Sequence, residues 1–315
     1  QLSYWPAYTS NHLDLSETFT DWLWKVRAEN KKYTKAFFQV PGLNVPGVTT
    51  ISGKPMGGWI QYSFSPSVSC WLAQHFYWQW KYSGSETFLR ERTYPYLKEV
   101  ATFVENITYL KDGKRKMLLS SSPEYFDNSI KAWFLDFTNY DLSLMRNTLS
   151  MAVEAAQKLN YREDVLKWKN LLGSLPELDV NETGLTIAPG QNLDESHRHI
   201  AQLMALHPLG SINPDSDSNK AVIENTVYNG FRWQLVDREL DANIIHNIKP
   251  TKQTKVQSLG YIAKLSNSKS EILNVYLDRK TAAHFNGYVS SSALDNHVKN
   301  FTITNGNYYK LFDEC

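Results

Sequence analysis

The feature that most constrains this fold is a helical repeat of apolar residues in the middle of the chain. From Leu142 to Leu159, apolar side chains recur every three or four positions, which places them on one face of an α-helix. The pattern begins again after Arg162 and ends at Gly173–Pro176, where a glycine followed by a proline is a typical helix end. These two segments predict a helical hairpin.

Further helices are predicted earlier in the chain. Residues 67–82 are apolar nearly all round, which is typical of a helix buried on most sides. Helices are also expected over 13–28 and 86–92, and from Pro95 onward, since proline is favoured in a first helical turn. Helical hairpins in series indicate a stacked or closed array, and periodicity alone does not distinguish a ring from an open solenoid.

Residues 39–67 form a long segment rich in glycine and proline between two predicted helices. Loops of this length are either functional or disordered. Because this one also contains Trp59 and Tyr62, we expect an ordered binding loop.

The pattern weakens from about residue 229. A helix is expected over 230–248, and short strands are expected at 274–277 and 301–304.

The composition excludes several classes of protein. The formal net charge of +1 gives no indication of a nucleic-acid partner, and no segment reaches the roughly 20 apolar residues of a membrane span. Motifs of serine hydrolases, nucleotide enzymes and zinc proteases are absent. The 10 Trp and 18 Tyr suit a core, but such rings also suit half-wet sugar-binding clefts. With two cysteines there is no disulfide framework, and Cys70 is expected to be a buried free thiol.

The sharpest chemical signal is the segment Ser120–Tyr125, where Pro123 fixes the chain just before Glu124. Glycoside hydrolysis needs a carboxylic acid that donates a proton to the leaving oxygen, and partial burial favours the protonated form. Glu124 is a candidate for that acid. The alternative is a glutamate placed at a helix N-terminus by the helix dipole.

A second signal is Ser196 followed by His197, Arg198 and His199. Ser196 is typical of an N-cap, which would put the three side chains on a first helical turn, where they could bind sugar hydroxyls. Two alternatives are a plain capped helix and a metal site, although two histidines without a third ligand are weak evidence for zinc. We expect no metal and no cofactor.

These motifs resemble glycoside hydrolase family 95, whose members are inverting α-L-fucosidases and relatives. The resemblance rests on four short motifs in the family's order, and it is good over 2–214 and poor over 229–315. The motifs are Tyr4-Trp5-Pro6-Ala7, Trp71-Leu72-Ala73-Gln74-His75, Ser122-Pro123-Glu124 and His197-Arg198-His199. The resemblance implies an all-α fold, an (α/α)6 toroid with few short strands, as a single domain over 1–315 that lacks its first helices.

The resemblance also implies roles for individual residues. Glu124 matches the family's general acid, and the His-Arg-His run matches substrate-binding residues. We expect Trp5, Trp59 and His75 to contact substrate as well, although a lone histidine in an apolar helix is more often a hydrogen-bonded core residue.

One match departs from the family. Asn305 stands where the family has an aspartate that assists the base, and an amide cannot accept a proton at neutral pH. If the alignment slips, Asp295 or Asp313 could serve instead.

The sequence therefore predicts a glycoside hydrolase that acts on a terminal α-linked sugar such as L-fucose by an inverting acid/base mechanism. The alternatives are an inert carbohydrate-binding or structural protein on the same scaffold, and a polysaccharide lyase of toroid fold. Expected partners are a glycan substrate and a missing N-terminal segment or β-sandwich of the same protein. Three glycosylation acceptors agree with a secreted or extracytoplasmic protein: Asn106, Asn181 and Asn300.

Overall fold

The computed structural model describes residues 1–127, 129–194, 197, 199–230, 262–265, 272–276, 282–283, 294, 298 and 308–311. The chain divides into two compact units, Gln1–Arg232 and Trp233–Cys315.

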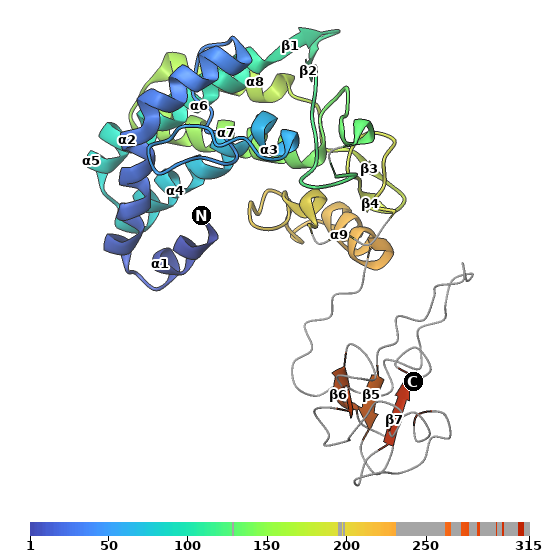
Figure 1. The fold of residues 1–315 in the computed structure, drawn as a ribbon. Coiled ribbons are helices and arrows are strands. Elements are labelled where there is room, and N and C mark those ends of the chain that lie inside the picture. The colour runs from blue at the N-terminus through green and yellow to red at the C-terminus, as the bar shows by residue number, and fades with distance from the viewer. Residues whose placement is uncertain are drawn as a thin grey trace. The chain divides into compact units, whose positions relative to one another are not determined.

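The first unit is a set of packed helices with a few short strands (Figure 1). Its α-helices are α1 (Trp5–Thr9), α2 (Leu13–Phe38), α3 (Ile60–Phe64), α4 (Val68–Ser83), α5 (Glu86–Phe88), α6 (Tyr94–Ile107), α7 (Asn139–Lys158), α8 (Arg162–Ser174) and α9 (Asp217–Gly230). Its single-turn elements are η1 (Leu2–Tyr4), η2 (Leu89–Thr93), η3 (Ile130–Ala132) and η4 (Ala201–Leu203), of which η2 is a π-helical turn and the others are 3-10 helices. Its strands form two antiparallel hairpins, β1 (Thr108–Lys111) with β2 (Lys114–Met117), and β3 (Val180–Asn181) with β4 (Gly184–Leu185).

Helices α4 and α7 form the centre of this unit. Helix α4 packs against α2, α6 and α7, and α7 also packs against α6 and α8. Phe76 of α4 has no exposed surface, and its ring stacks on that of Tyr96 of α6 with centroids 4.0 Å apart. The predicted all-α class with few short strands is confirmed in that the described residues are mostly helical. Cys70 is the buried free thiol expected from its helix.

Two predicted helices differ in extent from those observed. Helix α2 continues to Phe38, beyond the predicted end at residue 28, because its last turns bury polar rather than apolar side chains. The Thr34 hydroxyl accepts a hydrogen bond from the Asn44 backbone N–H at 2.7 Å. The helix expected over 86–92 is only the short α5, which passes directly into the π-helical turn η2.

The loop over residues 39–67 is ordered, as predicted. Leu43 and Val45 are buried in the core, and the loop contains the short helix α3. The loop passes so close to α6 at Gly42 that there is no room for a side chain. A Cβ at Gly42 would lie 2.3 Å from the Phe103 backbone nitrogen, and the residue has φ +107°.

We therefore expect Gly42→Ala to destabilise the protein by more than about 1 kcal/mol, because alanine is strained at positive φ and would collide with backbone. Urea unfolding of the variant measures this change. Gly113→Ala is the control, since its Cβ would meet nothing within 4 Å at φ +77°. If the two variants lose the same free energy of unfolding, the close approach of the loop to α6 does not contribute to the cost of Gly42→Ala.

In the second unit the described strands form one antiparallel sheet. Strand β5 (Ile262–Leu265) lies between β6 (Ile272–Tyr276) and β7 (Tyr308–Leu311). Strand β6 confirms the strand predicted at 274–277, displaced by one or two residues. The predicted helix beyond Gly230 and the predicted strand at 301–304 lie outside the described residues. The single domain over 1–315 and the closing of the helices into a ring stay predictions.

Within the described residues, none of the helices combines the length and the apolar character required to cross a bilayer.

Candidate active site

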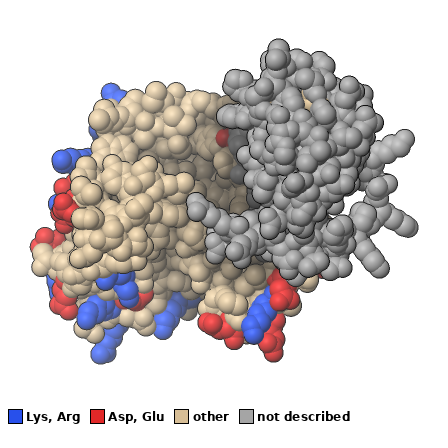
Figure 2. Space-filling view, turned by 90° about the horizontal axis from the view of Figure 1, so that it is seen from below, with Lys and Arg blue, Asp and Glu red and all other residues tan. Residues whose placement is uncertain are grey.

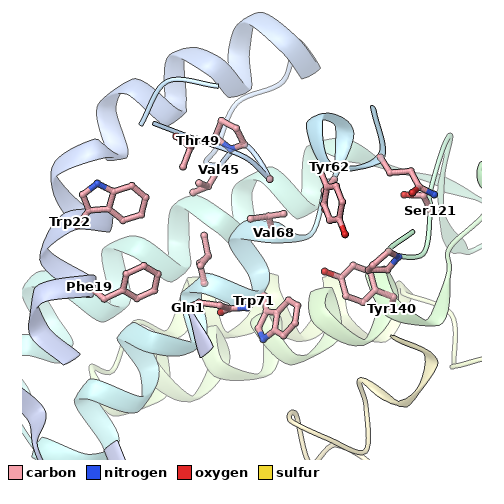
Figure 3. A pocket seen from close by; sticks show the side chains of 16 residues that line it. Gln1, Phe19, Trp22, Val45, Thr49, Tyr62, Val68, Trp71, Ser121 and Tyr140 are labelled. Atoms are coloured by element: carbon pink, nitrogen blue, oxygen red, sulfur yellow. The ribbon is translucent and has the colours of Figure 1, made fainter. Parts of the chain in front are cut away.

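An aromatic cavity of about 340 Å³ opens in the first unit, between α2, α4, α7 and the loop that contains α3 (Figure 3). Its size lies within the range of roughly 300–1,000 Å³ that is usual for small-molecule sites. Its apolar walls include Phe19 and Trp22 of α2, Trp71 of α4 and Tyr140 of α7. Among the described residues, none of the side chains that line it is a lysine, arginine, aspartate or glutamate. Such a cavity suits a neutral ligand that has both apolar faces and hydroxyl groups.

Pro123 lines this cavity, and the next residue is Glu124. Glu124 lies in an irregular turn at φ +59°, a left-handed conformation that is uncommon for residues other than glycine. The following helical turn, η3, begins only at Ile130, so the alternative of a helix N-terminal glutamate is wrong. Held strain of this kind clusters at functional sites. The observed geometry therefore favours a functional role for Glu124.

Both carboxylate oxygens of Glu124 face polar side chains. The Tyr62 hydroxyl of α3 donates to Oε1 at 2.6 Å, and His199 Nε2 lies 3.3 Å from Oε2. The side chain of Glu124 is only 15% exposed, whereas that of His199 is 40% exposed. The structure thus places the predicted acid beside one of the predicted substrate-binding histidines and in contact with Tyr62, which lines the cavity.

Side-chain contacts hold the Glu124 turn in place. Gln61 Nε2 of α3 donates to the Tyr125 backbone oxygen at 3.0 Å. The Tyr125 hydroxyl donates to Asp194 Oδ1 at 2.6 Å, and its ring meets that of His197 edge-on at 5.7 Å. These contacts join the Glu124 turn to α3 on one side and, on the other, to the histidine segment, which contains His197 and His199.

The histidine segment does not form the predicted helix. His197 and His199 lie in an irregular stretch, and the next helical turn that the structure describes is the short η4, which begins at Ala201. Within this stretch the His199 backbone N–H donates to His197 Nδ1 at 3.1 Å. Ser196 and Arg198 lie outside the described residues, so the N-cap and the role of Arg198 stay predictions.

His75 lies behind the cavity wall. It has no exposed surface, and its ring nitrogens face Tyr8 Oη at 3.1 Å and Gln1 Oε1 at 3.2 Å. Burial lowers the pKa of His75 to about 3, so the ring is neutral at physiological pH. This placement favours the hydrogen-bonded core role, in which His75 supports Gln1, a residue that does line the cavity. Direct contact of His75 with substrate stays a prediction.

The two tryptophans expected to bind substrate lie apart from the cavity lining. Trp5 of α1 packs edge-on against Trp78 and His207. Trp59 is the N-cap residue of α3 and is 39% exposed. Their contacts with substrate stay predictions. Asn305, the residue expected in place of the base, lies outside the described residues, so its distance from Glu124 is not defined.

In Figure 2 the Lys, Arg, Asp and Glu side chains of the described part gather mostly along the left and lower edges, and the surface between those edges is largely uncharged. Within the described part of the chain, His, Cys, Asp and Glu nowhere form a group of three or more that could hold a metal ion.

Sequence reasoning did not assign Tyr62, Gln61 or Tyr140 to the site. Tyr62 was noted only as one of the aromatic residues of the long loop. The sequence holds no signal that would select it, because its approach to Glu124 depends on how α3 packs against a turn about sixty positions later in the chain.

The predicted acid becomes a carboxylate when it gives up its proton, and a hydrogen bond to a charged group is worth about 1.5–3 kcal/mol. We therefore expect Tyr62→Phe to lower kcat/KM for a glycoside by about 10- to 100-fold. Steady-state kinetics measure this effect. The matched control is Tyr82→Phe, whose ring is 50% exposed. Unchanged kinetics in Tyr62→Phe would show that this hydrogen bond does not orient Glu124.

The chain is similar to known proteins over most of its length. The model of the family described as "Glycosyl hydrolase family 95 catalytic domain" matches residues 1–307. The chain is 23% identical over 219 residues to "Alpha-L-fucosidase 2" of Arabidopsis thaliana, a match that covers 66% of this chain and 26% of that protein. A solved structure described as "Putative kojibiose phosphorylase from human microbiome" is 16% identical with a TM-score of 0.40, over 56% of this chain and 27% of that one.

Proposed function

Since this chain belongs to glycoside hydrolase family 95, we propose that it takes part in hydrolysing the glycosidic bond of a terminal α-linked sugar such as L-fucose. The relative named an α-L-fucosidase supports this choice of sugar. The observation that carries the proposal is Glu124, held in a left-handed turn between Tyr62 and His199 beside a neutral aromatic cavity.

Glu124 is the general acid in this proposal. Because Oε1 accepts the hydrogen bond from Tyr62, we assign the transferable proton to Oε2, which faces His199 Nε2. As the glycosidic bond breaks, that proton passes from Oε2 to the leaving oxygen, and the departing alcohol is released neutral. A water molecule attacks the anomeric carbon from the opposite face and loses its proton to the base, which inverts the configuration.

His199 stands next to the oxygen that bears this proton. With a half-exposed ring beside the buried carboxyl, it is placed to bind a sugar hydroxyl close to the scissile bond. His197 and Tyr125 fix the segment from which His199 extends.

The test is release of free sugar by the natural protein from aryl α-L-fucoside, α-galactoside and α-rhamnoside. Proton NMR of the first product distinguishes the anomers, and an α-fucoside should give β-fucose first. If the protein hydrolyses none of these substrates but still binds sugar, the result would support the alternative of an inert binding protein, in which Asn305 has replaced the aspartate of the family. First formation of the α-anomer would contradict inversion.

We further propose that the protein is secreted. The acceptor Asn106 is exposed at the end of α6, and Asn181 is partly buried, with its amide bonded to Asn192. A glycan at Asn106, found by mass spectrometry before and after enzymatic deglycosylation, would support secretion. Its absence from protein made in the native host would count against it.

A further inference from the structure

A fully buried carboxylate, Asp141, lies in the first turn of α7. It is 1% exposed, and its own backbone N–H is capped by the Thr138 hydroxyl at 3.3 Å. A helix N-terminus favours negative charge, but a buried charge is tolerated only with further hydrogen bonds. None of the chemistry proposed above uses this residue.

Two hydroxyl groups donate to Asp141 from different parts of the chain. Ser67, the N-cap residue of α4, donates to Oδ1 at 2.5 Å. Ser120 donates to Oδ2 at 2.6 Å. The Ser120 oxygen also accepts from the Thr138 backbone N–H at 2.9 Å, which fixes its orientation.

Each serine is close in sequence to one member of the candidate active site. Ser67 follows α3, which contains Tyr62, and Ser120 precedes the turn that contains Glu124. These same two segments meet again at the cavity wall in the hydrogen bond from Tyr62 to Glu124. Asp141 and this hydrogen bond therefore join the same two segments at two places.

We propose that Asp141 is a positioning residue, whose carboxylate clamps the Ser67 and Ser120 segments and thereby sets the distance between Tyr62 and Glu124. This inference rests on the proposed function for its kinetic consequences. The clamp needs the ionised form, because only a carboxylate accepts from both hydroxyls without offering a proton of its own.

The charge state of the clamp changes in mildly acidic solution. Burial raises the pKa of Asp141 from 3.8 to about 6, although the bonds from Ser120 and Ser67 oppose the shift. The titratable groups that the described structure places beside it are Tyr140 on α7 and Cys70 on α4. Burial raises the pKa of both, so both are neutral near pH 6.

The stability of the fold follows from the sign of this shift. Because the folded state holds the proton more tightly than the unfolded state, the ionised form disfavours folding, and stability falls as pH rises from about 4 through 6. Asp141→Asn removes that ionisation. The Tm of Asp141→Asn, compared with that of the natural protein at the same pH, should therefore rise between about pH 4 and pH 6. If Asp141 made only a structural contact, the Tm of the variant at pH 7 would be lower than that of the natural protein.

The kinetic test uses Asp141→Asn with Asp136→Asn as control, since the Asp136 side chain is 30% exposed and is paired with Lys116. An amide cannot accept from both serines through two oxygens, so we expect kcat of Asp141→Asn to fall about 10- to 100-fold at pH 7, as for a small misplacement of a catalytic group. Protonation of Asp141 should release the clamp, so we expect the natural protein to lose activity as the pH falls through about 6. This loss should disappear from the pH profile of Asp141→Asn. Ser67→Ala should move that loss to higher pH, because it removes a bond that favours the anion.

Crystal structures of the natural protein and Asp141→Asn give a readout that does not need turnover. The proposal predicts that the Tyr62 Oη–Glu124 Oε1 distance of 2.6 Å lengthens beyond hydrogen-bonding range in the variant. If this happens in a protein without hydrolase activity, the proposed function fails and the clamp stands. An unchanged distance, or wild-type kcat with an unchanged pH profile, overturns the clamp even where the protein is an active hydrolase.

Discussion

Replacing Glu124 by glutamine should lower kcat for an alkyl α-L-fucoside by about 10²–10⁴-fold, the usual contribution of general acid catalysis. An amide at this position keeps the size of the side chain and can still bond to Tyr62, but it has no proton to give to the leaving oxygen. The measurement is initial-rate kinetics at pH 7, together with thermal unfolding to show that the fold is intact.

Glu177→Gln is the matched control, because the Glu177 side chain is 81% exposed and pairs only with Arg146 among the described residues. Its kcat should stay within a factor of about two of the natural value, in line with the small worth of exposed ion pairs. Full activity in Glu124→Gln would remove Glu124 from the mechanism and leave its left-handed turn without a catalytic explanation.

The largest loss of stability is expected for Phe76→Ala. The Phe76 ring is fully buried at the centre of the helical unit, stacked on Tyr96 and tilted against Trp24. Removing a buried aromatic ring costs about 3–5 kcal/mol, because transfer free energy is lost and a cavity is left behind. Urea unfolding followed by circular dichroism measures the change.

Phe37→Ala is the control for that experiment, since Phe37 lies on α2 with its side chain 45% exposed. It should cost no more than about 1 kcal/mol, as substitutions away from the core usually do. If both variants lose the same free energy of unfolding, the packing of α4 against α2 and α6 does not contribute more to stability than an exposed position does.

The helical part of the fold could be predicted because its signal is local. Helices α4, α7 and α8 each bury an apolar face, and the 3.6-residue period marks that face directly in the sequence. The end of α2 was missed because its last turns bury Asn30 and Thr34, and a hydrophobic pattern does not register buried polar residues. Helix α9 was missed for a related reason, since its sequence is mostly polar.

The candidate site could be predicted only in part. Glu124 stood out because a proline and three serines precede a carboxylate, and the His-Arg-His run stood out by composition. The predicted helix around His199 was wrong, since His197 and His199 lie in an irregular stretch. Tyr62 and Asp141 carry no local signal, since both act through contacts with segments distant in the chain.

The most direct test of Glu124 as the acid compares two substrates that differ only in their need for a proton. The fluoride of α-L-fucosyl fluoride departs as a stable anion without acid assistance, whereas the alcohol of an alkyl α-L-fucoside requires a proton to leave. In Glu124→Gln the rate on the alkyl fucoside should fall by about 10²–10⁴-fold, while the rate on the fluoride stays close to that of the natural protein. An equal fall on both substrates would contradict the assignment, because it would show that Glu124 does something other than protonate the leaving group.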